Sequence, residues 1–165
     1  MEKKLLLLSF LFFAVPAQAY TCYDYGRLAI QGSLVTDGNL SIGITHYTEQ
    51  SEIGVYASGL VNNACCETRI FAPGIFAGFR KNICECTYFA AGIDFVSVFG
   101  TENCCHIDAD YTVGPYISLE QKLTSHLLLI GWIQPFSYQY EDKCNCTVAT
   151  NRFFASGGIA MSYLF

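Results

Sequence analysis

The end of the chain, residues 152–165, alternates between large apolar side chains and small or polar ones, and it stops on an aromatic ring. One face carries Phe153, Ala155, Gly157, Ile159, Met161, Tyr163 and Phe165, and the other carries Arg152, Phe154, Ser156, Gly158, Ala160, Ser162 and Leu164. A period of two residues is that of a β-strand. Because the last residues of a soluble domain usually fray in water, this pattern predicts a terminal strand held in a sheet up to its final ring.

Seven further segments have the length and composition of strands. They cover residues 27–36, 40–48, 52–61, 69–80, 87–99, 111–121 and 126–138. Asp-Gly, Asn-rich and cysteine-bearing pieces separate them, as in hairpin connections. Segment 126–138 is apolar on both faces, and its Pro135 would leave a gap in a hydrogen-bond ladder. The chain is therefore predicted to be all-β, with eight antiparallel strands.

The composition narrows the class of β protein. Hydrophobic residues make up 52% and aromatic residues 15% of the chain, whereas charged residues make up 14%, against about 25% in soluble domains. After the first residues, no run approaches the ~20 apolar residues that a membrane-spanning helix needs. The net charge of −5 without basic clusters excludes nucleic acid as a partner. These features are typical of a transmembrane β-barrel.

The beginning of the chain has the pattern of a secretory signal peptide. Lys3 and Lys4 precede an apolar run at residues 5–15, and Ala17 and Ala19 form a small-x-small cleavage site. The run is too short to span a bilayer. We therefore expect residues 1–19 to be a cleaved signal peptide and residues 20–165 to be a single β-barrel domain.

The polarity of the two strand faces favours a membrane barrel over a soluble one. The polar face is dominated by Gly, Ala, Ser and Tyr, which would make a poor aqueous surface. Its isolated charges have both signs and would pair in a narrow lumen: Arg27, Glu52, Arg80, Asp94, Glu120 and Arg152. The alternative is a soluble secreted barrel or sandwich, stapled by disulfides, that binds a small apolar ligand.

Signal peptide, eight strands and a last strand ending in "MSYLF" together resemble the small outer-membrane barrels of Gram-negative bacteria, the OmpA-like/OmpX-like superfamily. The resemblance implies contact with outer-membrane lipid, a structural or surface-interaction role, and no cofactor. It also implies that Tyr163 and Phe165 form the signal read by the barrel-assembly machinery. Large lumen side chains such as Tyr56, Phe76, Tyr88 and Tyr116 are expected to fill so narrow a barrel.

Nine cysteines lie outside the predicted strands and form the candidates for disulfide bonds: Cys22, Cys65, Cys66, Cys84, Cys86, Cys104, Cys105, Cys144 and Cys146. Secretion favours their oxidation, and the geometry of adjacent cysteines favours bonds between loops over bonds within a pair. The odd total leaves one thiol free or bonded to another cysteine-rich envelope protein. A metal site in "CCHIDAD" is less favoured, because these pairs lack zinc spacing.

Catalysis is not expected. Some barrels that resemble this chain modify lipid A or cleave peptides, and the nearest candidate groups here are Ser125, His126 and Glu120. They straddle one predicted turn without any sign that they converge. A lipid-modifying enzyme therefore stands as an alternative to the structural role.

Overall fold

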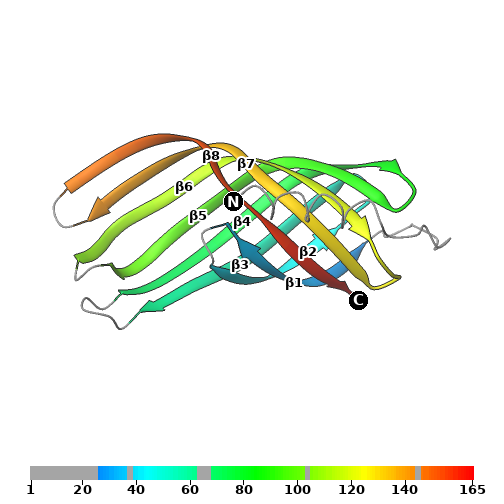
Figure 1. Cartoon of the computed structure of the whole chain (residues 1–165), viewed down its shortest axis with the longest axis horizontal. Coiled ribbons are helices and arrows are strands. Elements are labelled where there is room, and N and C mark those ends of the chain that lie inside the picture. Colours follow the sequence, from blue (N-terminus) through cyan, green and yellow to red (C-terminus); the bar gives the residue numbers. More distant parts are fainter. Residues whose placement is uncertain (1–25, 37–38, 63–67, 103–104, 144–145) are drawn as a thin grey trace, which may run out of the picture.

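The computed structural model describes residues 26–36, 39–62, 68–102, 105–143 and 146–165. The predicted signal peptide, residues 1–19, lies outside these ranges. The described residues form eight strands in chain order (Figure 1). They are β1 (Arg27–Val35), β2 (Leu40–Tyr47), β3 (Ser51–Asn62), β4 (Thr68–Cys84), β5 (Thr87–Glu102), β6 (Cys105–Lys122), β7 (Leu127–Lys143) and β8 (Cys146–Leu164).

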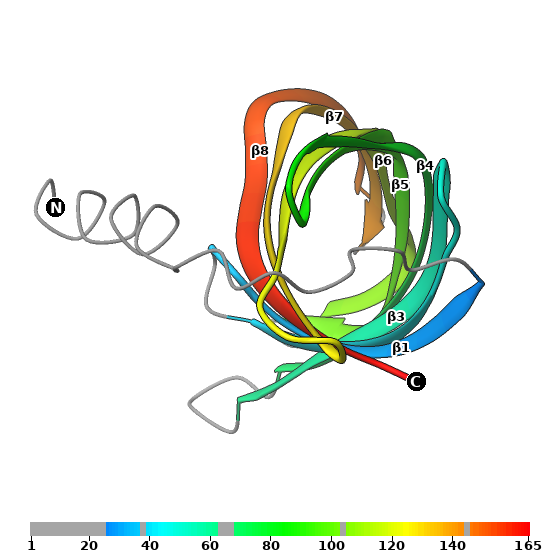
Figure 2. The same cartoon turned by 90° about the vertical axis from the view of Figure 1, so that its right-hand side faces the viewer.

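The strands form a closed ring in which each pairs antiparallel with its chain neighbours (Figure 2). The last strand closes the ring on the first, with Ala29 opposite Leu164 and Val35 opposite Gly158. The backbone N–H of Phe165 donates to Leu28 O at 2.9 Å, which extends this seam to the final residue. The predicted all-β, eight-stranded barrel is therefore confirmed. No helix within the described ranges is long and apolar enough to cross a membrane.

Large apolar side chains cover the outside of the ring. Exposed isoleucine, leucine, valine, phenylalanine and tyrosine side chains occur on all eight strands, among them Ile42, Val55, Ile75, Ile93 and Phe136. Monomeric soluble proteins rarely expose contiguous apolar patches beyond a few hundred Å². A continuous belt of this kind requires lipid around it, and it argues against the soluble alternative.

The belt is bordered by aromatic rings at two levels. Phe71 pairs with Phe99 across β4 and β5, and Phe136 pairs with Phe153 across β7 and β8. Toward the opposite end, β5 carries Phe89. The ten residue steps from Phe89 to Phe99 span about 33 Å along the strand, or about 25 Å along the membrane normal at the usual tilt. That height matches the apolar band of an outer-membrane barrel.

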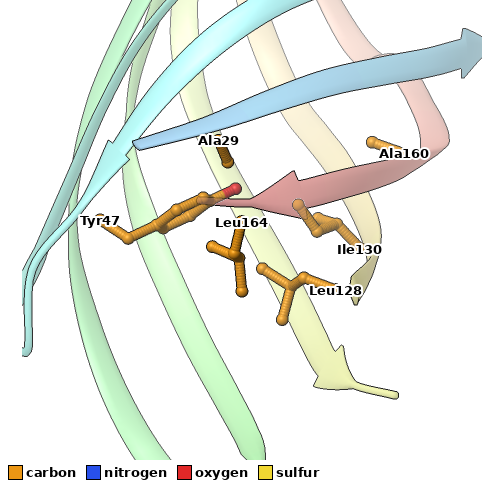
Figure 3. Packing of buried hydrophobic residues seen from close by; sticks show 6 residues of the cluster. All are labelled: Ala29, Tyr47, Leu128, Ile130, Ala160 and Leu164. Atoms are coloured by element: carbon orange, nitrogen blue, oxygen red, sulfur yellow. The ribbon is translucent and has the colours of Figure 1, made fainter. Parts of the chain in front are cut away.

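The apolar interior is small and lies at one end of the lumen. Six buried residues form it, from β1, β2, β7 and β8 (Figure 3): Ala29, Tyr47, Leu128, Ile130, Ala160 and Leu164. We call this end of the barrel the terminal end, because β8 ends there. The opposite end is called the loop end, because the strands there lead into the cysteine-bearing connections 63–67, 103–104 and 144–145. The terminal end of the lumen is therefore closed by packed side chains.

Several strands are longer than the sequence pattern indicates. β6 begins at Cys105 instead of residue 111, β7 continues to Lys143 instead of residue 138, and β8 begins at Cys146 instead of residue 152. The prediction that all cysteines lie outside strands is accordingly wrong for Cys84, Cys105 and Cys146. The ladder hydrogen bonds continue beyond the apolar belt, where water meets both faces and no alternation marks the strand.

Pro135 disturbs the ladders on both sides of β7, as predicted. The register shifts between Gln134 and Phe136 toward β8, and between Val113 and Ile117 toward β6. A one-residue shift exchanges the two faces of a strand. On β8, residues 154 and 155 both stand opposite Pro135, and Phe154, predicted to face the lumen, is exposed with a φ of 51°. Arg152, opposite Ser137, is also exposed but lines the lumen cavity.

Candidate functional site

The buried charges of the lumen centre on Arg80. Its Nε lies 2.6 Å from Glu120 Oε2, and the two side chains are 1% and 0% exposed. Arg80 projects from β4 and Glu120 from β6, so both reach across β5, where the small Ala90 pairs with Arg80 and leaves room. The guanidinium also lies over the rings of Tyr88, at 3.7 Å, and Tyr47, at 4.9 Å. An ion pair and two cation–π contacts thus fix this cation.

Two more carboxylates of the lumen are held by tyrosines. Tyr116 donates to Glu52 Oε1 at 2.6 Å. Tyr56 donates to both oxygens of Asp94, at 2.9 and 3.0 Å. These tyrosine hydroxyls orient the two carboxyl groups within the barrel.

Glycines opposite these rings make the arrangement possible. A Cβ on Gly74 would lie 2.3 Å from the Tyr56 ring, and a Cβ on Gly54 would lie 2.4 Å from the Phe76 ring. Phe76 in turn packs edge-on against Tyr116, with ring centroids 5.7 Å apart. The glycine-rich lumen face noted in the sequence therefore provides the space that the aromatic rings occupy.

The six charges predicted as one lumen network occupy three places. Glu52, Arg80 and Glu120 lie together near the terminal end, and Asp94 lies with Tyr56 nearer the middle. Arg27 stands at the terminal rim, where its Nη1 donates to Ser125 O at 3.0 Å. Arg152 lies 3.7 Å from Glu141 on the exposed part of β8. Arg27 lies at the terminal end of β1 and Arg152 lies toward the loop end of β8, so neither reaches the cluster around Arg80.

The loop-end half of the lumen contains a cavity of about 620 Å³. All eight strands contribute to its lining. The expectation that side chains fill the barrel is therefore correct for the terminal end and wrong for the loop end. On β1 and β2 the lumen face carries small groups such as Ser33 and Ser41, which hydrogen bond to each other and do not reach across.

Two residues that line this cavity were missed in the sequence. Asp110 and Glu141 pair with each other across β6 and β7. Both lie in segments that were assigned to connections. The only local sign of a strand is that Asp110 alternates with Thr112 and Glu141 with Gln139. Because these segments have no apolar face, the sequence does not identify them as strands.

The described cysteines differ in their surroundings. Cys84 at the end of β4 and Cys146 at the start of β8 are exposed free thiols. Cys86, between β4 and β5, is buried, has a φ of 59° and takes part in a disulfide bond. Cys105 is the first residue of β6. The other candidates lie outside the described residues: Cys22, Cys65, Cys66, Cys104 and Cys144.

Among the described residues, the groups considered for catalysis do not converge, and Cys104 of the segment considered for metal binding lies outside the described residues. Glu120 is buried against Arg80, whereas His126 lies in the exposed turn before β7. There the His126 ring nitrogen Nδ1 is 3.0 Å from Leu164 O, and the ring stacks on Tyr163. Within the described ranges, no group of three or more His, Cys, Asp or Glu is placed to hold a metal ion.

The predicted assembly signal lies on the outside of the barrel. Tyr163 and Phe165 are exposed, and their rings contact each other edge-on at 5.3 Å, while Leu164 between them is buried in the lumen cluster. The end of β8 therefore presents two aromatic rings to the surroundings at the terminal end.

No protein-family model matches the chain, and no curated protein sequence matches it significantly. Among solved structures, Neisserial surface protein A is similar with a TM-score of 0.52 and 12% identity, over 84% of this chain and 92% of that chain. A de novo designed transmembrane β-barrel follows with a TM-score of 0.49 and 12% identity, over 86% and 98%. The Yersinia pestis outer membrane protein Ail, solved in a phospholipid bilayer nanodisc, has a TM-score of 0.44 and 11% identity, over 85% and 99%.

At such identities the likeness concerns the fold alone. The likeness to Neisserial surface protein A agrees with the closed eight-stranded ring described above. The predicted resemblance to small outer-membrane barrels is confirmed at that level. The chain has the fold of an eight-stranded transmembrane β-barrel of the outer-membrane type.

Proposed function

We propose that the protein resides in the outer membrane of a Gram-negative bacterium and presents its loop-end strands for contacts at the cell surface, without catalysis. The observation that carries this proposal is the extension of β7 and β8 past the aromatic border of the belt. Beyond Phe136 and Phe153, the two strands continue to Lys143 and Cys146 (Figure 1). A barrel that served only to fill the membrane would need no such extension.

The exposed surface of this extension supports an interaction role. β8 pairs with β1 only from Gly158 onward. Its residues from Cys146 to Arg152 pair with β7 and are all exposed. Phe154 projects beside them in a left-handed conformation, 85% exposed. Such a conformation costs a bulky residue about 1–2 kcal/mol, which is consistent with a ring retained for contact.

The finer parts of the proposal concern processing and cysteine chemistry. We infer that residues 1–19 direct secretion and are removed, and that the barrel-assembly machinery reads Tyr163 and Phe165. The loop cysteines other than Cys146, whose thiol is free, would then cross-link to one another or to cysteine-rich neighbours. The oxidising compartment that secretion implies supports this chemistry.

Selective thiol labelling tests the topology. Intact cells are treated with a membrane-impermeant maleimide, and the labelled positions are mapped by peptide mass spectrometry. We expect modification of Cys146 in intact cells and of Cys84 only after the outer membrane is permeabilised. Cys146→Ser and Cys84→Ser variants serve as matched controls for peptide assignment. Labelling of Cys84 but not Cys146 in intact cells would contradict the proposed orientation.

A further inference from the structure

The lumen cavity has the dimensions of a ligand site. Its volume of about 620 Å³ falls within the range of about 300–1,000 Å³ that is typical of small-molecule sites. Tyr47, Glu52, Tyr116 and Ile130 form its lining at the terminal end, and Ile107, Gln139 and Arg152 contribute toward the loop end. The packed cluster beneath Tyr47 closes one end, so a molecule would enter from the loop end.

The charges of the lining select the sign of a ligand. Among the described residues that line the cavity, four carry carboxylates and one carries a guanidinium: Glu52, Asp94, Asp110 and Glu141 against Arg152. Arg80, a further cation among the described residues, is turned toward Glu120 and does not line the cavity. In a confined lumen of low dielectric, such an excess attracts cations and repels anions.

The carboxylates lie at three levels along the barrel. Glu52 pairs with Gly78, which pairs with Gly92 on β5, so Glu52 is level with Gly92. Asp94 follows two residues further along β5. Asp110 pairs with Val98, four residues beyond Asp94, and Glu141 is level with Asp110.

At about 3.3 Å per residue, the successive steps between these levels are about 7 and 13 Å along the strand. A compact cation can contact one level only. An extended molecule with several positive charges can contact all three.

Buried polar atoms in the lining lack partners. Ser118 Oγ and Gln134 Nε2 belong to side chains that are each 4% exposed and line the cavity, and they make no hydrogen bond to the described residues. A buried polar atom left without a partner costs about 1–3 kcal/mol. Ser156 already donates to Gln134 Oε1. A polar ligand would supply the missing partners.

We propose that this cavity binds a linear aliphatic polyamine. Its ammonium groups would contact the carboxylates at successive levels, and its methylene segments would lie along Val96, Val98 and Ile107 of the lining. The rings of Tyr56 and Trp132 also line the cavity and offer cation–π contacts.

The chain reports on this site itself, because Trp132 is its only tryptophan. The full protein, purified in uncharged detergent, is titrated with spermidine, butylamine and the dianion adipate while tryptophan fluorescence is recorded. We expect a saturable change with spermidine, binding at least about tenfold weaker with butylamine because it carries a single charge, and no saturable change with adipate. Absence of a saturable response to spermidine, or an equal response to adipate, would overturn the proposal.

Variants locate the binding. Asp94→Asn and Asp110→Asn keep the shape of the lining and remove one charge each, so each is expected to weaken spermidine binding by about tenfold or more. Glu49→Gln is the matched control, because Glu49 is exposed in the turn between β2 and β3 at the terminal end. Folding of every variant is verified by its gel shift between unheated and boiled samples. If folded Asp94→Asn and Asp110→Asn proteins bind spermidine like the parent, the cavity is not the site.

Discussion

Arg80 shows at the scale of single residues how the barrel tolerates charge in its interior. Its Nη1 and Glu120 Oε1 make no hydrogen bonds within the described ranges, so the ion pair and the tyrosine rings carry most of its stabilisation. Removal of one partner of a buried ion pair leaves the other uncompensated. The cluster is therefore expected to be sensitive to loss of Arg80 alone.

We expect Arg80→Met to lower the free energy of unfolding by about 3–5 kcal/mol, since Glu120 would lose its counter-charge in the lumen. The measurement is urea unfolding of the protein folded into lipid vesicles. The control is Arg152→Met, whose pair with Glu141 is exposed and should contribute no more than about 1 kcal/mol. Equal losses in the free energy of unfolding for the two variants would show that the buried Arg80–Glu120 pair contributes no more than an exposed pair.

The lumen glycines allow a second prediction. Gly74→Ala places a methyl group against the Tyr56 ring, which must move from its hydrogen bonds to Asp94. Overpacking of this kind costs about 1–3 kcal/mol, measurable as a lower thermal midpoint. Gly32→Ala is the control, because a Cβ on Gly32 meets nothing within 4 Å. A Gly74→Ala protein as stable as the control would show that the ring has room to shift.

At the scale of the elements, the last strand carries the closure of the ring. Deletion of Phe165 removes the hydrogen bond from its N–H to Leu28 O and the ring that contacts Tyr163. We expect the amount of folded barrel in the outer-membrane fraction to fall markedly, while the same chain still folds when diluted from urea into detergent. Phe165→Tyr keeps both features and should assemble normally. Normal assembly of the deletion variant would refute the role of the terminal ring.

The strands illustrate which part of the fold was predictable. Within the apolar belt, apolar side chains face lipid and polar ones face the lumen, so their alternation marks each strand in the sequence. β1, β2 and β3 therefore match their predicted bounds within a residue or so. Beyond the belt, β6, β7 and β8 are held by cross-strand hydrogen bonds between residues distant in sequence. No local pattern encodes that pairing, so Asp110 and Glu141 were assigned to connections.

The lumen charges were recognisable as a set but not as an arrangement. Alternation predicted that Arg80, Glu120 and Glu52 face inward, because each is adjacent to a large apolar residue assigned to the outer face: Phe79, Leu119 and Ile53. Which of them meet depends on the register between β3, β4, β5 and β6, and on the space left at Ala90. The exposure of Phe154, which was predicted to face the lumen, follows from the bulge opposite Pro135, and this bulge cannot be derived from the sequence of β8 alone.

At the scale of the whole molecule, the surroundings determine what each exposed side chain contributes. In water, the apolar belt would drive the chains together, because about 25 cal/mol is gained per Å² of apolar surface removed from solvent. In lipid, the same belt is the stable outer surface, and unpaired backbone groups are avoided because the ring is closed. The interior can then remain polar and partly empty without loss of the fold.

In a membrane, the cost of an outward-facing charge depends on its depth in the bilayer. This gives a final prediction that separates a membrane barrel from a soluble one. Ile93 lies in the middle of the belt on β5, between Phe89 and Phe99, whereas Val148 lies on β8 beyond the border formed by Phe153; both are exposed. Ile93→Arg should lower the free energy of unfolding in vesicles by about 2–4 kcal/mol, and Val148→Arg by about 0–1 kcal/mol. The two values are compared by urea unfolding with Trp132 fluorescence. In a soluble barrel an arginine at either exposed position would meet water, so equal and small effects would refute the membrane assignment.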